Sequence, residues 1–275
     1  MIMRYLLLII LLSSIHFSQS QVLKEVWATE RVLKTPESVF YNQQRNEIYV
    51  SNINGKPTEK DGNGFISLLD TTGAIMKLYW VTGLDAPKGI AVLNDTLLVT
   101  DIDRLHIISI SGAKILKTIL VEGASFLNDI IFLGNGTALI SDMGTDKIMV
   151  LKDGKVDTWL EDPLLNRPNG LVLTKKYIAL GVKNSVLSVN ADTKQVKVLI
   201  DETGPVDGLI HLGANKFVVS DWSGRIIQVN STEKVVLSNT TENNIQAADL
   251  GFIPDKKWVL IPTFFDNRVV ASQLQ

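Results

Sequence analysis

Short apolar runs alternate with polar turns along the chain, and the arrangement repeats. Each repeat opens on one variable residue followed by an apolar run, and a second apolar run follows about ten residues later. The six openings are Glu37-Ser-Val-Phe, Lys88-Gly-Ile-Ala, Asn128-Asp-Ile-Ile, Asn169-Gly-Leu-Val, Asp207-Gly-Leu-Ile and Ala248-Asp-Leu-Gly. Successive openings are about 40 residues apart, with a first interval of about 50. A repeat of this period indicates a closed or stacked architecture.

The apolar runs have the composition of β-strands. They are rich in Val, Ile and Leu, and Gly, Asn, Asp and Ser separate them. Residues 92–98 and 132–139 each predict two strands joined by a tight turn. Residues 148–156 and 226–235 supply the next two strands of their repeats, and no convincing helical stripe occurs. Six four-stranded units predict an all-β chain in which residues 21–275 form one six-bladed β-propeller.

Two segments depart from the repeat. Val22 to Trp27 has no repeat of its own, and we expect it to pair with residues 268–274, completing the last blade and closing the ring. The first repeat carries about ten extra residues in the polar, glycine-rich loop 54–64. Such a loop either reaches over a site or remains an ordinary surface loop.

Residues 1–20 have the pattern of a secretory signal peptide. A short positive start precedes an apolar stretch from Tyr5 to Leu12, and Ser18 and Ser20 provide small residues before Gln21. The apolar stretch is short for a bilayer-spanning anchor, although a retained anchor is the alternative. The sequence therefore predicts a secreted or periplasmic protein.

Composition excludes several classes of function. The net charge is −2 and there is no basic block, so neither nucleic acid nor a membrane surface is an expected partner of the exported chain. No cysteine is present, which removes thiol nucleophiles and thiolate metal ligands. The sequons at Asn94, Asn135, Asn230 and Asn239 allow glycosylation, or are turn sequences that fit the pattern by chance. The sequence does not specify the oligomeric state.

The variable residues indicate a metal site. Ring closure turns the six openings towards a common axis, so Glu37, Asn128, Asn169 and Asp207 face one another from four blades. Burying two carboxylates together is costly, and one divalent cation offsets that cost. The oxygen donors favour calcium, with magnesium, manganese or zinc as alternatives, although zinc usually adds His or Cys. The other interpretation is that these side chains cap strands and hold water in the channel.

Four segments at these openings resemble a known family. They are Pro36-Glu37-Ser-Val-Phe, Phe126-Leu-Asn128-Asp129, Arg167-Pro-Asn169-Gly170-Leu171 and Pro205-Val-Asp207-Gly208-Leu209. Their order and spacing are similar to those of the senescence marker protein/gluconolactonase (regucalcin-like) family of six-bladed propellers, over nearly the whole mature chain. The resemblance implies one axial divalent metal held by Glu37, Asn169 and Asp207, with Asn128 contacting the substrate or metal-bound water. Paraoxonase-type lactonases have a similar set of side chains around calcium.

The resemblance implies hydrolysis of a small-molecule lactone or related ester. In such a site the metal polarises the carbonyl, Asp207 accepts the proton of the attacking water, and Asn128 and Lys88 donate hydrogen bonds. Lys88 can instead only balance the carboxylates. Phe126 stands where sugar lactonases of the family often have arginine, so sugar specificity is in doubt and Phe126 would contact a more apolar substrate.

Two other functions remain open. The first is a non-catalytic binding propeller with a structural metal. The second is a strictosidine-synthase-like enzyme, for which only Glu122 and Glu161 are candidate catalytic glutamates. Serine-hydrolase elbows, nucleotide loops and zinc-protease motifs do not occur in the sequence.

The remaining polar and aromatic residues have expected structural roles. His106 and His211 lie in apolar runs and are expected to be strand histidines with satisfied hydrogen bonds. The recurrent aspartates after the second strands are expected to fix turns: Asp101, Asp142 and Asp221. Four tryptophans are expected to pack between blades: Trp80, Trp159, Trp222 and Trp258.

Overall fold

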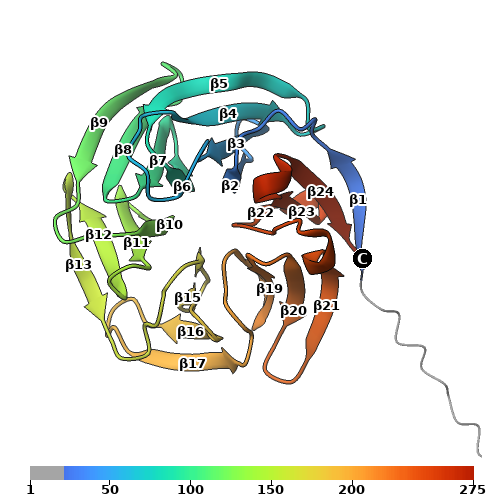
Figure 1. Cartoon of the computed structure of the whole chain (residues 1–275). Coiled ribbons are helices and arrows are strands. Elements are labelled where there is room, and N and C mark those ends of the chain that lie inside the picture. The colour runs from blue at the N-terminus through green and yellow to red at the C-terminus, as the bar shows by residue number, and fades with distance from the viewer. Residues whose placement is uncertain (1–21) are drawn as a thin grey trace, which may run out of the picture.

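Six antiparallel four-stranded sheets form a ring (Figure 1). The computed structural model describes residues 22–275. The first three blades are β2 (Pro36–Asn42), β3 (Glu47–Asn52), β4 (Gly64–Asp70) and β5 (Ile75–Leu84); β6 (Pro87–Leu93), β7 (Thr96–Asp101), β8 (Arg104–Ser109) and β9 (Lys114–Leu120); and β10 (Leu127–Gly134), β11 (Thr137–Asp142), β12 (Lys147–Lys152) and β13 (Lys155–Glu161).

The other three blades have shorter inner strands. They are β14 (Leu171–Leu173), β15 (Ile178–Gly181), β16 (Ser185–Val189) and β17 (Val196–Asp201); β18 (Leu209–Gly213), β19 (Lys216–Asp221), β20 (Arg225–Val229) and β21 (Lys234–Asn239); and β22 (Gly251–Ile253), β23 (Trp258–Pro262), β24 (Val269–Leu274) and β1 (Leu23–Ala28). The short 3₁₀ helices are η1 (Thr241–Asn243), η2 (Pro254–Lys256) and η3 (Phe264–Asp266). The predicted all-β six-bladed propeller is confirmed.

The ring closes through the last blade. Strand β1 pairs antiparallel with β24, from Leu23 opposite Leu274 to Ala28 opposite Val270. It is therefore the outer strand of a blade whose other strands come from the opposite end of the sequence (Figure 1). The predicted closure by the N-terminal strand is confirmed. The predicted signal peptide, residues 1–20, lies outside the described residues.

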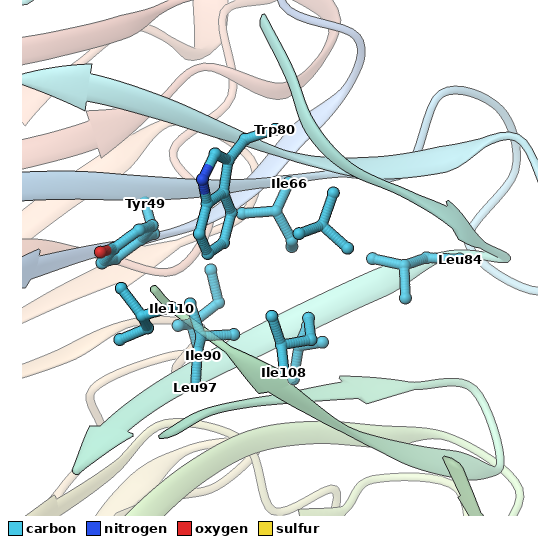
Figure 2. Packing of buried hydrophobic residues seen from close by; sticks show 10 residues of the cluster. Tyr49, Ile66, Trp80, Leu84, Ile90, Leu97, Ile108 and Ile110 are labelled. Carbon is cyan, nitrogen blue, oxygen red and sulfur yellow. The ribbon is translucent and has the colours of Figure 1, made fainter. Parts of the chain in front are cut away.

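Apolar side chains of neighbouring blades fill the space between the sheets. In Figure 2 Tyr49, Ile66 and Trp80 of the first blade face Ile90 and Leu97 of the second. The Tyr49 and Trp80 rings lie 5.1 Å apart, in the range of a favourable aromatic contact. Similar clusters between the other blades hold the ring together by burying apolar surface.

Three of the four tryptophans pack in the apolar clusters between blades, and the fourth contacts the neighbouring blade at the edge of the channel. Trp80, Trp159 and Trp258 pack against clusters between blades, as expected. Trp222 is outside these clusters: it follows the end of β19, is 43% exposed at one mouth of the central channel, and contacts Phe264 of the next blade with the ring centres 5.4 Å apart. An aromatic side chain in that position is available to a ligand.

Recurrent aspartates fix the segments that lead into the inner strands. Asp101, at the end of β7, accepts hydrogen bonds from the backbone amides of Asp85 (2.7 Å) and Ala86 (2.6 Å). These two residues form the connection between β5 and β6. Asp142 accepts hydrogen bonds from the amides of Ser125 (3.2 Å) and Phe126 (2.9 Å) in the same way. The predicted turn role of these aspartates is confirmed. Asp221 makes a shorter-range contact, accepting from the Ser223 amide at 3.1 Å.

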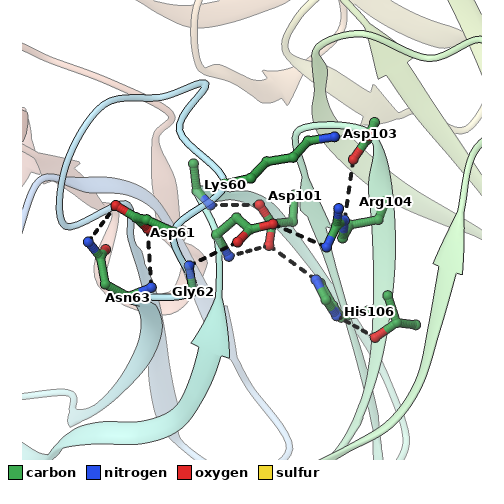
Figure 3. Close-up of polar contacts among 11 residues, drawn as sticks. Lys60, Asp61, Gly62, Asn63, Asp101, Asp103, Arg104 and His106 are labelled. Atoms are coloured by element: carbon green, nitrogen blue, oxygen red, sulfur yellow. Dashed lines mark hydrogen bonds and ion pairs between the residues drawn. The ribbon is translucent and has the colours of Figure 1, made fainter.

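Both strand histidines have hydrogen-bond partners, as predicted. The His106 ring is buried and contacts Asp101 at 3.1 Å and Thr118 at 2.8 Å (Figure 3). The His211 ring contacts the carbonyl of Ala214 at 3.0 Å. Neither histidine lines the channel cavity that contains Glu37.

The inserted loop of the first blade is attached to the second blade. Lys60 forms an ion pair with Asp103, and the Gly62 amide donates to Asp85 at 2.9 Å (Figure 3). Arg104 holds the same Asp85 carboxylate at 3.1 Å. Pro57, in the middle of the loop, lines the channel mouth. The loop therefore reaches the site, which is one of the two outcomes that its sequence allowed.

Within residues 22–275, the fold offers no helix long and apolar enough to traverse a lipid bilayer.

Candidate functional site

Irregular pairing at the start of the inner strands aims side chains into the channel. The pairing register of β2, β6 and β10 shifts by one residue between Pro36 and Val39, between Pro87 and Ile90, and between Leu127 and Ile130. Glu37, Lys88 and Asn128 are inside these shifts. A bulge redirects a side chain without ending the strand, and bulges are common beside functional sites. The repeated bulge explains why the variable position faces the axis.

In the last three blades the corresponding residues precede the strand, but the backbone pairing continues through them. The Asn169 amide donates to Gly181 (2.9 Å), the Asp207 amide to Ser220 (2.8 Å) and the Ala248 amide to Pro262 (3.1 Å). All six variable residues are buried, with at most 8% of their surface exposed. The prediction that they open the inner strands holds for three blades and is displaced by two or three residues in the others.

The glycines in the motifs make room for the next blade. A Cβ atom on Gly208 would lie 2.3 Å from the backbone nitrogen of Leu250, and one on Gly170 would lie 2.6 Å from the carbonyl oxygen of Asp207. Adjacent inner strands therefore approach too closely for a side chain to fit between them. This close approach brings the variable residues of successive blades together.

The predicted site residues share one cavity of about 570 Å³. Its floor contains Glu37, Lys88, Asn128, Asn169 and Asp207. Apolar side chains form most of the walls: Ile53, Pro57, Phe126, Met143, Pro205, Val206, Trp222, Phe264 and Phe265. Arg167 and Lys183 are also at the cavity. Glu122 and Glu161 are absent from this lining, so the cavity does not support the strictosidine-synthase-like alternative.

Three buried oxygens on the floor lack a hydrogen-bond donor among the described residues. They are Oε2 of Glu37, Oδ1 of Asn128 and Oδ1 of Asn169. The Asn169 Nδ2 group donates to Asp207 Oδ1 at 2.9 Å, which turns its own oxygen away from that carboxylate. A buried acceptor without a partner costs free energy unless a cation or ordered water satisfies it. These unpartnered oxygens are therefore suited to act as ligands of a hard cation.

A cation in this cavity would need amide ligands. Residues 22–275 contain no group of three or more His, Cys, Asp and Glu side chains placed to hold a metal ion. The floor instead combines the carboxylates Glu37 and Asp207 with the amides Asn128 and Asn169. Calcium sites commonly mix carboxylate and amide oxygens, whereas zinc sites favour His and Cys. The donor set thus suits calcium better than zinc.

Lys88 is fully buried beside the carboxylates but forms hydrogen bonds with the backbone. Its Nζ donates to the carbonyls of Pro57 and Ala86, each at 3.0 Å, and lies 4.5 Å from the centre of the Phe126 ring. Burial lowers the pKa of Lys88, while Glu37 and Asp101 oppose that shift. Lys88 thus anchors the inserted loop at the cavity and places one positive charge near Glu37.

Burial raises the pKa of the channel carboxylates. It raises the pKa of Glu37 well above its usual range, and repulsion from Asp207 and Asp249 adds to the shift. Burial also raises the pKa of Asp207 to about 7, helped by Asp249 and opposed by the hydrogen bond from Asn169. Among residues 22–275, four buried carboxylates lie along the channel and Lys88 carries the one buried ammonium group; the carboxylates are those of Glu37, Asp129, Asp207 and Asp249. The negative excess favours uptake of either protons or a cation.

We expect the metal-free protein to lose stability as the pH rises from about 5 to about 8. Asp207 and Asp249 have folded-state pKa values of about 7, above the usual 3.8. The folded state therefore holds more protons than the unfolded state between about pH 4 and 7, so stability falls as pH rises through that window. Above it the combined loss from the two groups is on the order of 5–10 kcal/mol. Thermal unfolding in chelator across this range measures the effect.

Excess calcium serves as the control for this measurement. Bound cation stabilises the ionised carboxylates, so the melting temperature should then change little, or rise, towards about pH 8. A metal-free protein that is more stable at about pH 8 than at about pH 5 would contradict the assignment of the raised pKa values.

Two channel carboxylates were missed by the sequence analysis. Asp129 and Asp249 each follow a variable residue directly and face a second cavity, of about 300 Å³, on the channel. Asp129 accepts a hydrogen bond from the Leu171 amide at 2.5 Å, and Asp249 accepts one from the Ser38 hydroxyl at 2.6 Å. Both contacts join neighbouring blades. Their position immediately after Asn128 and Ala248 was the available signal.

Comparisons with known proteins support the fold. No protein-family model matches the sequence, and no curated protein does so either. Among the solved structures, a chain of a nidogen/laminin complex is similar, with a TM-score of 0.60 and 16% identity. The alignment covers 78% of this chain and 91% of that one. At this identity the likeness shows the propeller fold alone.

Proposed function

We propose that the chain is a metal-dependent hydrolase of lactones or related esters. The observation that carries this proposal is the group of unpartnered buried oxygens of Glu37, Asn128 and Asn169, beside Asp207, on the floor of one cavity. The resemblance of the four segments to the gluconolactonase-type family supports the same reaction. Calcium is the proposed cation, because the donors are carboxylate and amide oxygens.

Each floor residue has a proposed task. Glu37, Asn169 and Asp207 would hold the cation, which when bound polarises a carbonyl and lowers the pKa of water. Asp207 is also the proposed acceptor of the proton from the attacking water, because its carboxylate lies beside Asn169 at the unpartnered oxygens of the floor. Asn128 Nδ2 lies 4.0 Å from the weak acceptor Met143 Sδ, so it can donate to the substrate oxygen. Lys88 supplies positive charge nearby.

Removal of the cation is expected to abolish hydrolysis. The mature protein would be treated with chelator, and the rates of aryl-ester and lactone hydrolysis would be measured before and after addition of calcium, manganese or zinc. We expect a loss of at least about 100-fold in chelator and the best recovery with calcium. Turnover that persists unchanged in the chelated protein would contradict the proposal.

A non-catalytic binding propeller with a structural cation is the second candidate. The similar solved structure is described as a nidogen/laminin complex, that is, an assembly of proteins. Exposed Trp222 and Phe265 at the cavity would also suit a bound partner. Stabilisation by calcium without turnover of any ester or lactone would favour this candidate over the hydrolase.

Export is part of the proposed function. The signal-peptide pattern of residues 1–20 supports a secreted or periplasmic protein that meets a small-molecule substrate outside the cytoplasm.

A further inference from the structure

An aromatic wall formed by Trp222, Phe264 and Phe265 stands at the mouth of the cavity. Trp222 follows β19, and the two phenylalanines begin η3, so adjacent blades contribute to the wall. The Trp222 ring lies 5.4 Å from Phe264 and 6.0 Å from Phe265, and the phenylalanines are 4.8 Å apart. All three pairs are close to perpendicular, which is the favourable edge-to-face arrangement. The wall is therefore a preformed surface.

Large apolar surface is exposed on this wall. Trp222 is 43% exposed and Phe265 is 61% exposed, although both rings contact the buried Phe264. Phe264 also has a positive φ of 49°, a conformation that is unfavourable for a bulky residue. The fold thus tolerates backbone strain where it presents Phe265 to the cavity. Strain of this kind is concentrated at functional sites.

The opposite wall is apolar as well. Phe126, Met143 and Pro57 line it. The ammonium group of Lys88 lies over the Phe126 ring, and the backbone amide of Phe126 donates a hydrogen bond to Asp142. Polar groups are concentrated on the floor, and the rim cations Arg167 and Lys183 are exposed to water. A polyhydroxylated lactone in this cavity would give up hydrogen bonds to water and find few replacements on the walls.

We propose that the substrates are lactones or esters with a hydrocarbon or aryl group, which lies between the aromatic wall and Phe126 while the carbonyl reaches the floor. This inference rests on the proposed hydrolase function and names its substrate class. Burial of each added methylene should raise kcat/KM about fourfold until the group fills the cavity. Trp222 and Phe265 are then specificity-determining residues, because they contact the substrate away from its reacting carbonyl.

The test compares γ-butyrolactone, γ-decanolactone and glucono-δ-lactone with the full mature chain in calcium. We expect a preference for γ-decanolactone of at least about 100-fold in kcat/KM over each of the others. The substitutions Trp222→Ser and Phe265→Ser should each reduce that preference about tenfold or more, because turnover of γ-decanolactone should fall much further than turnover of γ-butyrolactone. Tyr79→Ser is the matched control, since Tyr79 is an exposed aromatic residue on the outer strand β5.

A binding measurement separates this inference from the hydrolase proposal. The lactam analogue of γ-decanolactone, which resists hydrolysis, would be titrated by calorimetry against the same proteins. Binding that weakens in both wall variants supports the apolar site, even if no lactone is turned over. Equal or better turnover of glucono-δ-lactone, or a preference unchanged in both wall variants, would overturn the inference and leave the hydrolase proposal in place.

Discussion

Asp207→Asn is expected to abolish cation binding and at the same time to stabilise the metal-free protein. The asparagine can still accept the hydrogen bond that Asn169 donates to Oδ1 at 2.9 Å, so the local packing is kept. It cannot offer an ionised ligand, and it no longer repels Glu37 and Asp249. The two effects therefore have opposite signs, which a general folding defect would not produce.

The expected magnitudes are large. Calcium affinity should fall at least 100-fold, about 2.7 kcal/mol, and hydrolysis should fall at least about 100-fold because a base and a ligand are lost together. At about pH 8 in chelator the variant should melt above the parent protein, because it has one fewer buried carboxylate to keep neutral. Calorimetric titration with calcium and thermal unfolding in chelator provide the two measurements.

Asp157→Asn is the matched control for this substitution. Asp157 is exposed on the outer strand β13, so the same change in charge should leave calcium affinity and turnover unaffected. Calcium binding by Asp207→Asn with parental affinity would remove Asp207 from the site and with it the proposed mechanism.

Asp101→Asn is expected to destabilise the fold by about 2–4 kcal/mol. Both carboxylate oxygens of Asp101 are acceptors, for the amides of Asp85 and Ala86 and for His106, and the side chain is completely buried. An asparagine replaces one oxygen with an NH₂ group that faces another donor. Urea unfolding should therefore show a lower midpoint with an unchanged slope.

The equivalent aspartates make this an internal series. Asp142→Asn should cost a similar amount, because the buried Asp142 also accepts two backbone amides from the segment before its inner strand. Asp221→Asn should cost less than about 1 kcal/mol, since Asp221 is half-buried and its backbone contact is local. Equal losses of stability at all three positions would show that the hydrogen bonds to the segment before the inner strand are not the cause of the destabilisation.

The fold was predictable because the information was periodic. Six similar segments, repeated at intervals of about 40 to 50 residues, indicated the number of blades, and the unrepeated run from Val22 to Trp27 predicted the strand that pairs with β24. The variable residues predicted the floor of the cavity for the same reason, since equivalent positions of a ring share one environment. Patterns of this kind depend on local strand alternation, which sequence records directly.

The walls of the cavity were harder to predict. Trp222 was expected in the packing between blades, but it also lines the cavity, directly after Asp221. In two other blades the equivalent residues line the cavity as well: Ile53 follows Asn52, and Met143 follows Asp142. That shared position was the available signal. Phe265 offers no such pattern, because the positive φ of Phe264 in a short 3₁₀ turn decides its direction.

The two strands that close the ring, β1 and β24, are synthesised at opposite ends of translation. Leu23 pairs with Leu274, so a nascent β1 must leave the ribosome and wait for almost the entire polypeptide before its partner emerges. Contacts this distant in sequence slow folding, and the blades assembled earlier present unpaired edges in the interval. Chaperone protection during translation, and a channel cavity that is complete only after β24 is released, are the expected consequences of splitting one blade between both ends of the polypeptide.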